Sequence, residues 1–267
     1  MLSVLTLNIA AAARPRAQAL LAWLAARDDD VLVLTETSSG VGTAYLLDRF
    51  RQAGWLAEHA TDLAGERGTA VLSRLPATPR PELTAAITPA GRAVALTLAT
   101  RPAVTVLGVY VPSSDRAPAK VTRKRGFLAT LLAASGALPT PDRDHLVLAG
   151  DFNVVARDHQ PPYRGFLDFE YALLGNLAER GLVDAHQHLA PDTPVYSWLG
   201  RAGAGYRFDY IHTGSQLQSA IRDSAYLHQP REQRLSDHAA VTVTLDVSVA
   251  ARLRVDTAAL ADTGTLF

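Results

Sequence analysis

Residues 145–155 read HLVLAGDFNVV, a short apolar run followed at once by polar side chains. Leu146 to Ala149 have the pattern of a strand buried inside a sheet. Asp151 and Asn153 stand at alternate positions, which places both side chains on one side of an extended backbone. A carboxylate can take a proton or a cation, and an amide can donate to an anionic oxygen, so the pair suits a phosphate or a metal-bound oxygen. The alternative interpretation is a simple Asx turn, because Gly-Asp-x-Asn is good turn sequence.

Composition favours one α/β domain. The chain has 267 residues, of which 48% are hydrophobic, and no Pro-, Gly- or Ser-rich linker or long charge run divides it. We therefore expect a single domain over residues 1–249 and a weakly patterned tail of unknown role over residues 250–267. The sequence has no cysteine, which excludes disulfides, zinc–thiolate sites and thiol catalysis.

Charge gives no general attraction to a polyanion, because 26 basic and 26 acidic residues leave a formal net charge of zero. Any nucleic acid would have to meet a local patch. One basic cluster, Lys120, Arg123, Lys124 and Arg125, falls in a helix predicted over residues 117–134, and the alternative interpretation is a solvated helix face. No basic leader or long apolar segment is visible, so we expect a cytoplasmic protein with no membrane partner.

Polar residues recur at the ends of other predicted strands. Asn8 ends a strand over residues 2–9, and Glu36 follows one over residues 31–34. A predicted helix over residues 16–27 connects these strands, so if they are parallel both side chains reach the same sheet edge. Tyr110 closes another predicted strand. Taken singly, the first two could be solvated or capping residues and Tyr110 a core aromatic.

The last third of the chain adds three acidic or basic groups. Asp209 lies between Phe208 and Tyr210 in one of two strands predicted to pair, over residues 195–199 and 206–212. It is expected to be part-buried, and a buried carboxylate needs a partner. Asp237 and His238 directly precede the last alternating strand.

Taken together, these motifs resemble the endonuclease–exonuclease–phosphatase superfamily. The resemblance covers nearly the whole chain in order, and GDFN with SDH is its most specific part. The Tyr-Val-Pro of residues 110–112 is similar to the exonuclease III and abasic-site endonuclease branch. The matching segments are LTLNI, LTET, GTAVLS, GRAV, GVYVP, LAGDFNV, GLVDA, YSW, YRFDYI and SDHAAV.

The resemblance implies a four-layer α/β sandwich, with two mixed sheets face to face and helices outside. It also implies hydrolysis of phosphate esters with Mg²⁺ or Mn²⁺. Glu36 would be the main metal carboxylate, with Asn8 and Asp237 near it. The implied catalytic residues are Asp151 as base for the attacking water, Asn153 as holder of a phosphate oxygen, His238 oriented by Asp209 as stabiliser of charge on phosphorus, and Tyr110 beside the scissile phosphate.

The implied substrate is duplex DNA, cut at an abasic site or from a 3′ end by a monomer. Trp198, Tyr206 and Phe208 would form an apolar pocket for the sugar, and Lys120, Arg123 and Lys124 would contact phosphates. The sequence departs from the branch in having a short segment between Trp198 and Arg207 and no Gly-Leu-Arg run after Asn8. Two alternatives stay open: a hydrolase of RNA, a nucleotide, a phospholipid headgroup or an inositol phosphate, and a catalytically dead binding module.

Overall fold

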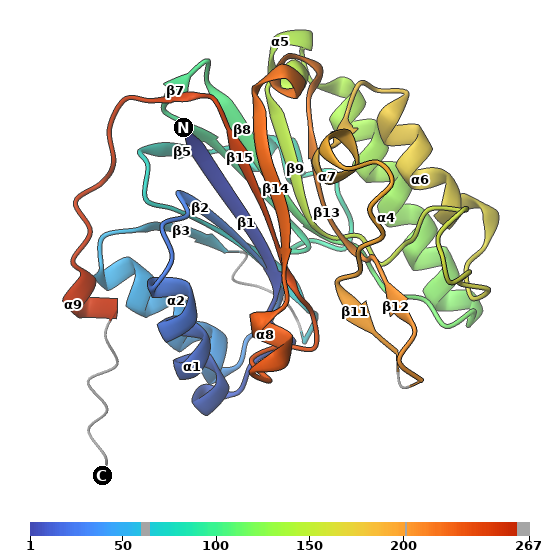
Figure 1. Cartoon of the computed structure of the whole chain (residues 1–267), viewed down its shortest axis with the longest axis horizontal. Helices are drawn as coiled ribbons and strands as arrows, with labels where there is room; N and C mark the ends of the chain where they lie inside the picture. The colour runs from blue at the N-terminus through green and yellow to red at the C-terminus, as the bar shows by residue number, and fades with distance from the viewer. Residues whose placement is uncertain (60–64, 201, 261–267) are drawn as a thin grey trace.

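Two six-stranded mixed sheets form the centre of the computed structural model, which describes residues 1–59, 65–200 and 202–260 (Figure 1). The first sheet has the order β14 (Ile221–Leu227), β15 (Ala240–Leu245), β1 (Leu2–Asn8), β2 (Val31–Thr37), β4 (Gly68–Ser73) and β3 (Leu56–His59). The second has the order β10 (Val183–Asp184), β13 (Asp209–Thr213), β9 (Leu146–Asp151), β8 (Val104–Tyr110), β6 (Ala93–Leu98) and β5 (Ala77–Pro79). Each sheet has one parallel pair, β1 with β2 and β8 with β9.

Helices cover the outer faces of both sheets. The first sheet carries α1 (Arg14–Ala25) and α2 (Val41–Gln52), and the second carries α4 (Pro118–Ala137) and α6 (Asp168–Ala178), as Figure 1 shows. The remaining short elements are α3 (Pro81–Thr84), β7 (Thr100–Arg101), α5 (Thr140–Asp144), α7 (Ala185–Leu189), β11 (Trp198–Leu199), β12 (Gly205–Tyr206), η1 (Ser215–Ala220), α8 (Gln229–Glu232), β16 (Ser248–Val249) and α9 (Thr257–Leu260). The predicted four-layer sandwich is confirmed.

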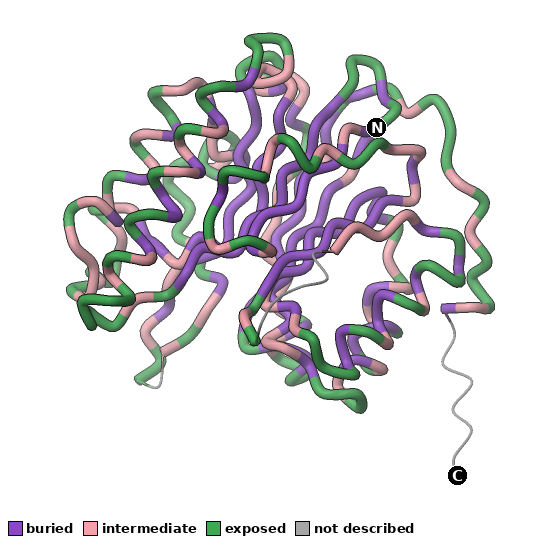
Figure 2. Tube along the Cα trace, turned by 180° about the vertical axis from the view of Figure 1, so that it is seen from behind, coloured by how far each residue is buried: buried purple, intermediate pink, exposed green. Residues whose placement is uncertain are grey.

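Three apolar clusters hold these four layers together. Strand β1 illustrates how: Val4 points into the cluster between the sheets, whereas Leu5 and Leu7 pack against Leu20 and Leu21 of α1. This alternation follows the two-residue period of a strand buried on both faces. Figure 2 shows the buried strands between helices whose outer sides are exposed. Each fully buried leucine side chain contributes about 1.5–3 kcal/mol.

The two sheets are in close contact at Gly108 of β8. A Cβ atom at this position would lie 2.8 Å from side-chain atoms of both Val33 and Val71 in the opposite sheet. Any side chain larger than hydrogen would therefore push the sheets apart or displace those valines. The glycine is required here by packing, since its φ is not in the left-handed region.

Some local predictions differ from the structure. The pairing expected between residues 195–199 and 206–212 is limited to Trp198–Leu199 with Gly205–Tyr206, whereas β13 pairs with β9. Strand β14 was not predicted. Part of the tail is ordered against the domain: Arg252 pairs with Asp30, and Leu260 is buried with α1 and α2. No helix among the described residues is long and apolar enough to cross a lipid bilayer.

Candidate active site

The polar residues at strand ends meet at one end of the two sheets. Tyr110 of β8 and Asp209 of β13 each lie opposite Asp151 of β9 in the strand registers. Asn8 and Glu36 come from the ends of the parallel pair in the first sheet. A cavity of about 250 Å³ opens there, lined by Glu36, Tyr110, Ser113, Ser114, Asp151, Asn153, Tyr163, Phe166, Trp198, Phe208, Asp237 and His238.

A glycine and an Asx turn hold Asp151 in place. Gly150 has φ 146°, and a Cβ there would lie 1.9 Å from the carbonyl oxygen of Val109, so no other residue fits. The Asp151 Oδ1 atom accepts a hydrogen bond of 2.9 Å from the Asn153 backbone N–H. Asn153 has φ 48°, a left-handed conformation that asparagine tolerates well. Asp151 and Asn153 therefore form an Asx turn and also line the polar cavity, so both interpretations of the sequence apply.

Asn8 connects the two sheets at Asp151. Its Nδ2 donates to Asp151 Oδ2 at 2.9 Å, and its Oδ1 accepts from the Ala10 N–H at 2.8 Å. Asp151 is 1% exposed. Burial, followed by the neighbouring Asp209 carboxylate, raises the pKa of Asp151 to about 8. This carboxyl group can therefore exchange a proton near neutral pH.

Asp209 finds the partner that its burial requires in His238. The His238 Nδ1–H donates to Asp209 Oδ2 at 2.6 Å, and Asp209 is fully buried. Burial alone would lower the pKa of His238, but the Asp209 charge and hydrogen bond override it and raise that pKa to about 10. The imidazolium is thus the stable form at neutral pH. Asp209 Oδ1 is buried and has no hydrogen-bond partner among the described residues.

Glu36 and Tyr110 form a third bond between the sheets. The Tyr110 hydroxyl donates to Glu36 Oε1 at 2.9 Å. Glu36 has φ 53° at a register irregularity between β2 and β4, which turns its side chain out of the ladder. The Arg92 guanidinium lies over the Tyr110 ring, 4.5 Å from its centre. Burial, then Glu36 and Asp151, raise the pKa of Tyr110 far above its ordinary value, so the hydroxyl keeps its proton.

The oxygen atoms around the cavity suit a hard divalent cation. Glu36 and Asp237 each use one carboxylate oxygen in a hydrogen bond, to Tyr110 and to Trp198 Nε1 at 3.2 Å respectively, and each has a second oxygen. Asp151, Asp209 and His238 have potential ligand atoms within 4.8 Å of one another, but hydrogen bonds already orient all three, and His238 would have to lose a proton to bind a cation. A cation would offset the Asp209 charge, which after burial is the next cause of the raised pKa of Asp151. The residues present therefore fit Mg²⁺ or Mn²⁺.

Aromatic rings form one wall of the cavity. Phe208 lies 5.7 Å from Trp198 and 5.9 Å from Tyr163, measured between ring centres, and Phe166 lies 4.4 Å from Tyr163. Of the three aromatics predicted for a pocket, Trp198 and Phe208 line the cavity. Tyr206 lies behind them, stacked on Phe208 at 5.9 Å. The wall therefore places aromatic rings beside Asp151 and His238.

Three of the four basic residues on α4 pair with acidic side chains, and the fourth, Arg125, lies over the Phe169 ring, 4.1 Å from its centre. Lys124, predicted to bind substrate, is fully buried and its Nζ bonds Glu170 at 2.6 Å and the Asn153 carbonyl at 2.7 Å. That prediction is wrong for Lys124, because a buried ion pair cannot reach a phosphate. Arg123 pairs with Glu66, and the exposed Lys120 pairs with Asp115 at 2.6 Å.

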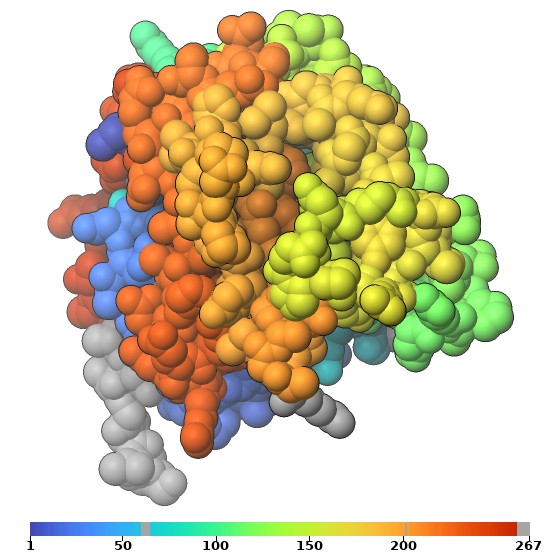
Figure 3. All heavy atoms as spheres, turned by 45° about the vertical axis from the view of Figure 1, so that its right-hand side comes forward, coloured from blue at the N-terminus to red at the C-terminus, as the bar shows by residue number. Residues whose placement is uncertain are grey.

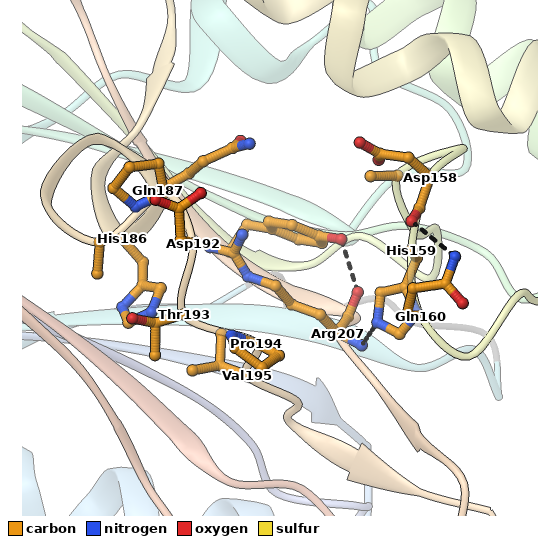
Figure 4. A pocket seen from close by; sticks show the side chains of 14 residues that line it. Asp158, His159, Gln160, His186, Gln187, Asp192, Thr193, Pro194, Val195 and Arg207 are labelled. Carbon is orange, nitrogen blue, oxygen red and sulfur yellow. Dashed lines mark hydrogen bonds between the residues drawn. The ribbon is translucent and has the colours of Figure 1, made fainter.

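A second cavity, of about 420 Å³, lies behind the aromatic wall. Figure 3 shows the hollow between residues 156–160 and 190–195. Arg207 lies at its centre (Figure 4), where its charge is already paired with Asp184 at 2.6 Å. Its Nε donates to the Tyr226 hydroxyl, which in turn donates to the Asp209 carbonyl at 2.7 Å. Arg207, which lines this cavity, therefore holds Asp209 in place through the Tyr226 hydroxyl.

A family model described as Endonuclease/Exonuclease/phosphatase family matches residues 5–245. The chain belongs to this family. The match spans all the strand ends described above, so the cavity lies within the family domain. No curated protein sequence matches the chain.

Solved structures of the family share the architecture. A 3′ phosphatase, NExo from Neisseria, solved bound to a product DNA hairpin, is 25% identical with a TM-score of 0.78. An AP endonuclease from Archaeoglobus fulgidus is 21% identical with a TM-score of 0.77. The 3′-5′ exonuclease NExo from Neisseria meningitidis is 24% identical with a TM-score of 0.76. Each comparison covers 92% of this chain and 100% of the other.

Sequence reasoning missed several residues of the cavity in this family member. Tyr163 and Phe166 fall in and just after a segment that reads as a polar loop, and Ser113 and Ser114 follow the Tyr-Val-Pro. The only signal was two aromatic residues within four positions of a Pro- and Gly-containing loop. Loop aromatics of this kind are candidates for a binding surface.

Proposed function

We propose that the protein is a divalent-metal-dependent phosphodiesterase that cuts DNA at abasic sites or from 3′ ends. The observation that supports this most is that Asp151, His238 and Glu36 line one cavity walled by aromatic rings, with Asp209 buried behind His238. Proton-accepting, charge-stabilising and cation-binding groups all face the same small volume, as phosphoryl transfer requires.

Asp151 is the proposed base for the attacking water. Its two oxygens are fixed by Asn8 and by the Asn153 backbone, so the carboxylate cannot rotate away from the cavity. Without a cation its pKa is raised by burial to about 8, which is close to neutral pH, where a general base works best. The base accepts the water proton as the oxygen attacks phosphorus.

Charge that develops on the phosphate is met by two donors. His238 keeps Nδ1–H on Asp209, so its Nε2–H is available for a phosphate oxygen. Asn153 Nδ2 donates one hydrogen to the Val111 carbonyl at 2.9 Å, which leaves its other hydrogen for the same phosphate. Tyr110 donates to Glu36 in this structure, so donation to the leaving oxygen requires its hydroxyl to turn.

Glu36 and Asp237 are the proposed cation ligands, with Asn8 beside them. Asp151, Asp209 and His238 are less suited to that task, because hydrogen bonds with Asn8, Asn153 and each other already orient them. A bound Mg²⁺ or Mn²⁺ supplies a positive charge against the phosphate oxygens.

The aromatic wall favours a sugar that lacks its base. Such a sugar unstacks at little cost, and its C–H groups can pack on the faces of Trp198 and Phe208. The neighbours described as an AP endonuclease and as a 3′ phosphatase bound to a DNA hairpin support the same substrate class. The competing assignments are RNA, a nucleotide, a phospholipid headgroup or an inositol phosphate, and a dead binding module.

A substrate panel tests the proposal. Abasic duplex, a duplex with a recessed or phosphorylated 3′ end, single-stranded RNA, nucleoside monophosphates and a phospholipid headgroup diester are compared at equal concentration, with Asp151→Asn as the inactive control. Abasic or 3′-end DNA should be cut fastest, and Phe208→Ala should reduce that preference. Faster turnover of a small phosphate ester than of any duplex would overturn the DNA assignment. If no ester is turned over, the protein is instead a catalytically dead binding module.

A further inference from the structure

An arginine groove adjoins the catalytic cavity on its Asp237 side. The groove has a volume of about 570 Å³ and is open to solvent along one side. Asp237 lines both the groove and the catalytic cavity, so the two hollows meet at this residue. The groove lies where α8 approaches the start of α1, since Arg16 of α1 donates to the carbonyl of Leu235, just after α8. Its lining residues are Ala10, Arg16, Leu199, Arg231, Arg234, Ser236 and Asp237.

No carboxylate neutralises the positive charge of the three arginines of the groove within the described residues. Across residues 1–59, 65–200 and 202–260, none of them forms an ion pair with a carboxylate, unlike Lys120, Arg123 and Lys124 on α4. The one acidic side chain in the lining, Asp237, accepts from Trp198 at the catalytic end. The groove is therefore a positive surface beside the candidate active site that acidic partners do not neutralise.

Two of the guanidinium groups are held in fixed positions. Arg16 donates to the carbonyl oxygens of Ile9, Ala10 and Leu235 at 3.1, 2.7 and 3.0 Å, which uses three of its five N–H groups. Arg231 bonds the Ser197 carbonyl at 3.3 Å and the His228 ring at 3.1 Å. Neutral partners fix these side chains without cancelling their charge, which lowers the entropy lost when they bind an anion.

Arg234 stands at the edge of the groove. It is exposed, its side chain has no hydrogen bond or ion pair within the described residues, and its φ is 58°. A left-handed conformation is uncommon for an arginine. It lies two residues after the end of α8, where the chain turns back so that the Leu235 and Ser236 N–H groups both reach the Pro230 carbonyl. Arg234 is thus free to bind a ligand that enters from solvent.

We propose that this arginine groove binds the sugar–phosphate backbone of the DNA strand that leaves the active site past Asp237. This inference rests on the proposed DNA substrate, and it specifies where one strand of that DNA lies on the protein. Guanidinium groups pair with phosphates in bidentate geometry, and a row of them beside the scissile position suits successive phosphates of one strand. Leu199, which is 37% exposed, offers an apolar edge for a sugar. An open groove favours a continuous chain over a free phosphate, which would be left largely in water.

The test compares Arg231→Ala, Arg234→Ala and the double variant with a matched control, Arg222→Ala, whose side chain pairs with Asp246 away from the groove. Abasic duplex and a small chromogenic phosphodiester are the two substrates. In the double variant, KM for the duplex should rise about tenfold with kcat nearly unchanged, and the slope of log affinity against log salt should fall by about 1 for each arginine removed. The small diester and the Arg222→Ala control should show no change.

Binding of a fluorescent duplex, measured without turnover, separates failure of the groove from failure of the proposed function. If wild type cuts the abasic duplex but the variants keep its KM and salt slope, the groove is overturned and the DNA assignment stands. If wild type cuts no DNA yet binds duplex through these arginines, the groove stands and the assigned reaction fails. Three results would overturn the proposed DNA groove. They are equal losses of activity on both substrates, no binding of duplex by wild type, and tight binding of inorganic phosphate that the variants lose. Arg231→Lys, which keeps the charge, should retain most of the affinity.

Discussion

Asp209 lies directly opposite Asp151 across the antiparallel pairing of β13 with β9, and both carboxyl groups are buried. Two such groups cannot both ionise without a nearby positive charge. The protein supplies one in His238, which binds Asp209 and has a raised pKa. We therefore expect the protonation of these three residues to affect both the stability of the protein and its proposed activity.

The metal-free protein should lose stability as the pH rises from about 6.5 to 10. The folded pKa of Asp151, about 8, is above its ordinary 3.8, so its contribution is full at low pH and lost as the pH rises through about 8. The folded pKa of His238, about 10, is above 6.5, so its contribution is full below 6.5 and lost toward 10. Thermal unfolding in chelator at each pH measures the sum. A Tm that stays constant or rises over this pH range would contradict these shifts. In Asp151→Asn, the fall of Tm with pH should be shallower below pH 8.

Asp209 and His238 should behave as one unit in catalysis. Asp209→Asn and His238→Ala should each lower kcat by about 10²- to 10⁴-fold, and the double variant little more, because each residue is ineffective without the other. Single-turnover kinetics of the three variants measure the coupling. Losses that multiply in the double variant would show that the pair does not act together.

Turnover should require a divalent cation. Excess chelator should abolish hydrolysis, and Mg²⁺ or Mn²⁺ should restore it, because the free oxygens of Glu36 and Asp237 are carboxylate ligands for a hard ion. Glu36→Gln should raise the metal concentration needed for half-maximal activity with little change in Tm, since the residue lies at the cavity edge. Titration of metal for both proteins provides the measurement. Full activity in chelator would remove the metal from the mechanism.

Lys124 should matter for stability and not for DNA affinity. Lys124→Ala leaves Glu170 as an unpaired buried charge, so the free energy of unfolding should fall by about 3–5 kcal/mol. Lys120→Ala, at an exposed pair, should change it by less than about 1 kcal/mol. Denaturant unfolding of both variants makes the comparison. A Lys124→Ala protein of normal stability but weak DNA binding would restore the substrate-contact interpretation.

The sequence indicated the fold because its polar residues sit at strand ends. Asn8, Glu36, Tyr110 and Asp151 each follow an apolar run, and parallel pairs in both sheets bring such ends together. The motifs also identified the superfamily, which the family match confirms. The link between Asp209 and His238 was predicted from the resemblance, and the structure places these side chains in contact.

Other features depend on contacts that no local pattern encodes. A basic helix face reads the same whether its charges are free or paired, so the burial of Lys124 against Glu170 was not visible. Arg16 and Arg231 are 215 residues apart, and only the folded chain brings them to one groove. Tyr163 and Phe166 reach the cavity through loop geometry, which lacks the periodicity of a helix or strand.

Gly108 sets the spacing between the two sheets, and this spacing also affects the candidate active site. Tyr110 lies two residues further along β8, and Glu36 lies three residues beyond Val33. The hydrogen bond between Tyr110 and Glu36 therefore forms just past this close contact between the sheets. The thickness of the hydrophobic interior at this point therefore sets how far apart the two halves of the cavity stand. A methyl group added deep in the core would widen the catalytic cavity without touching it.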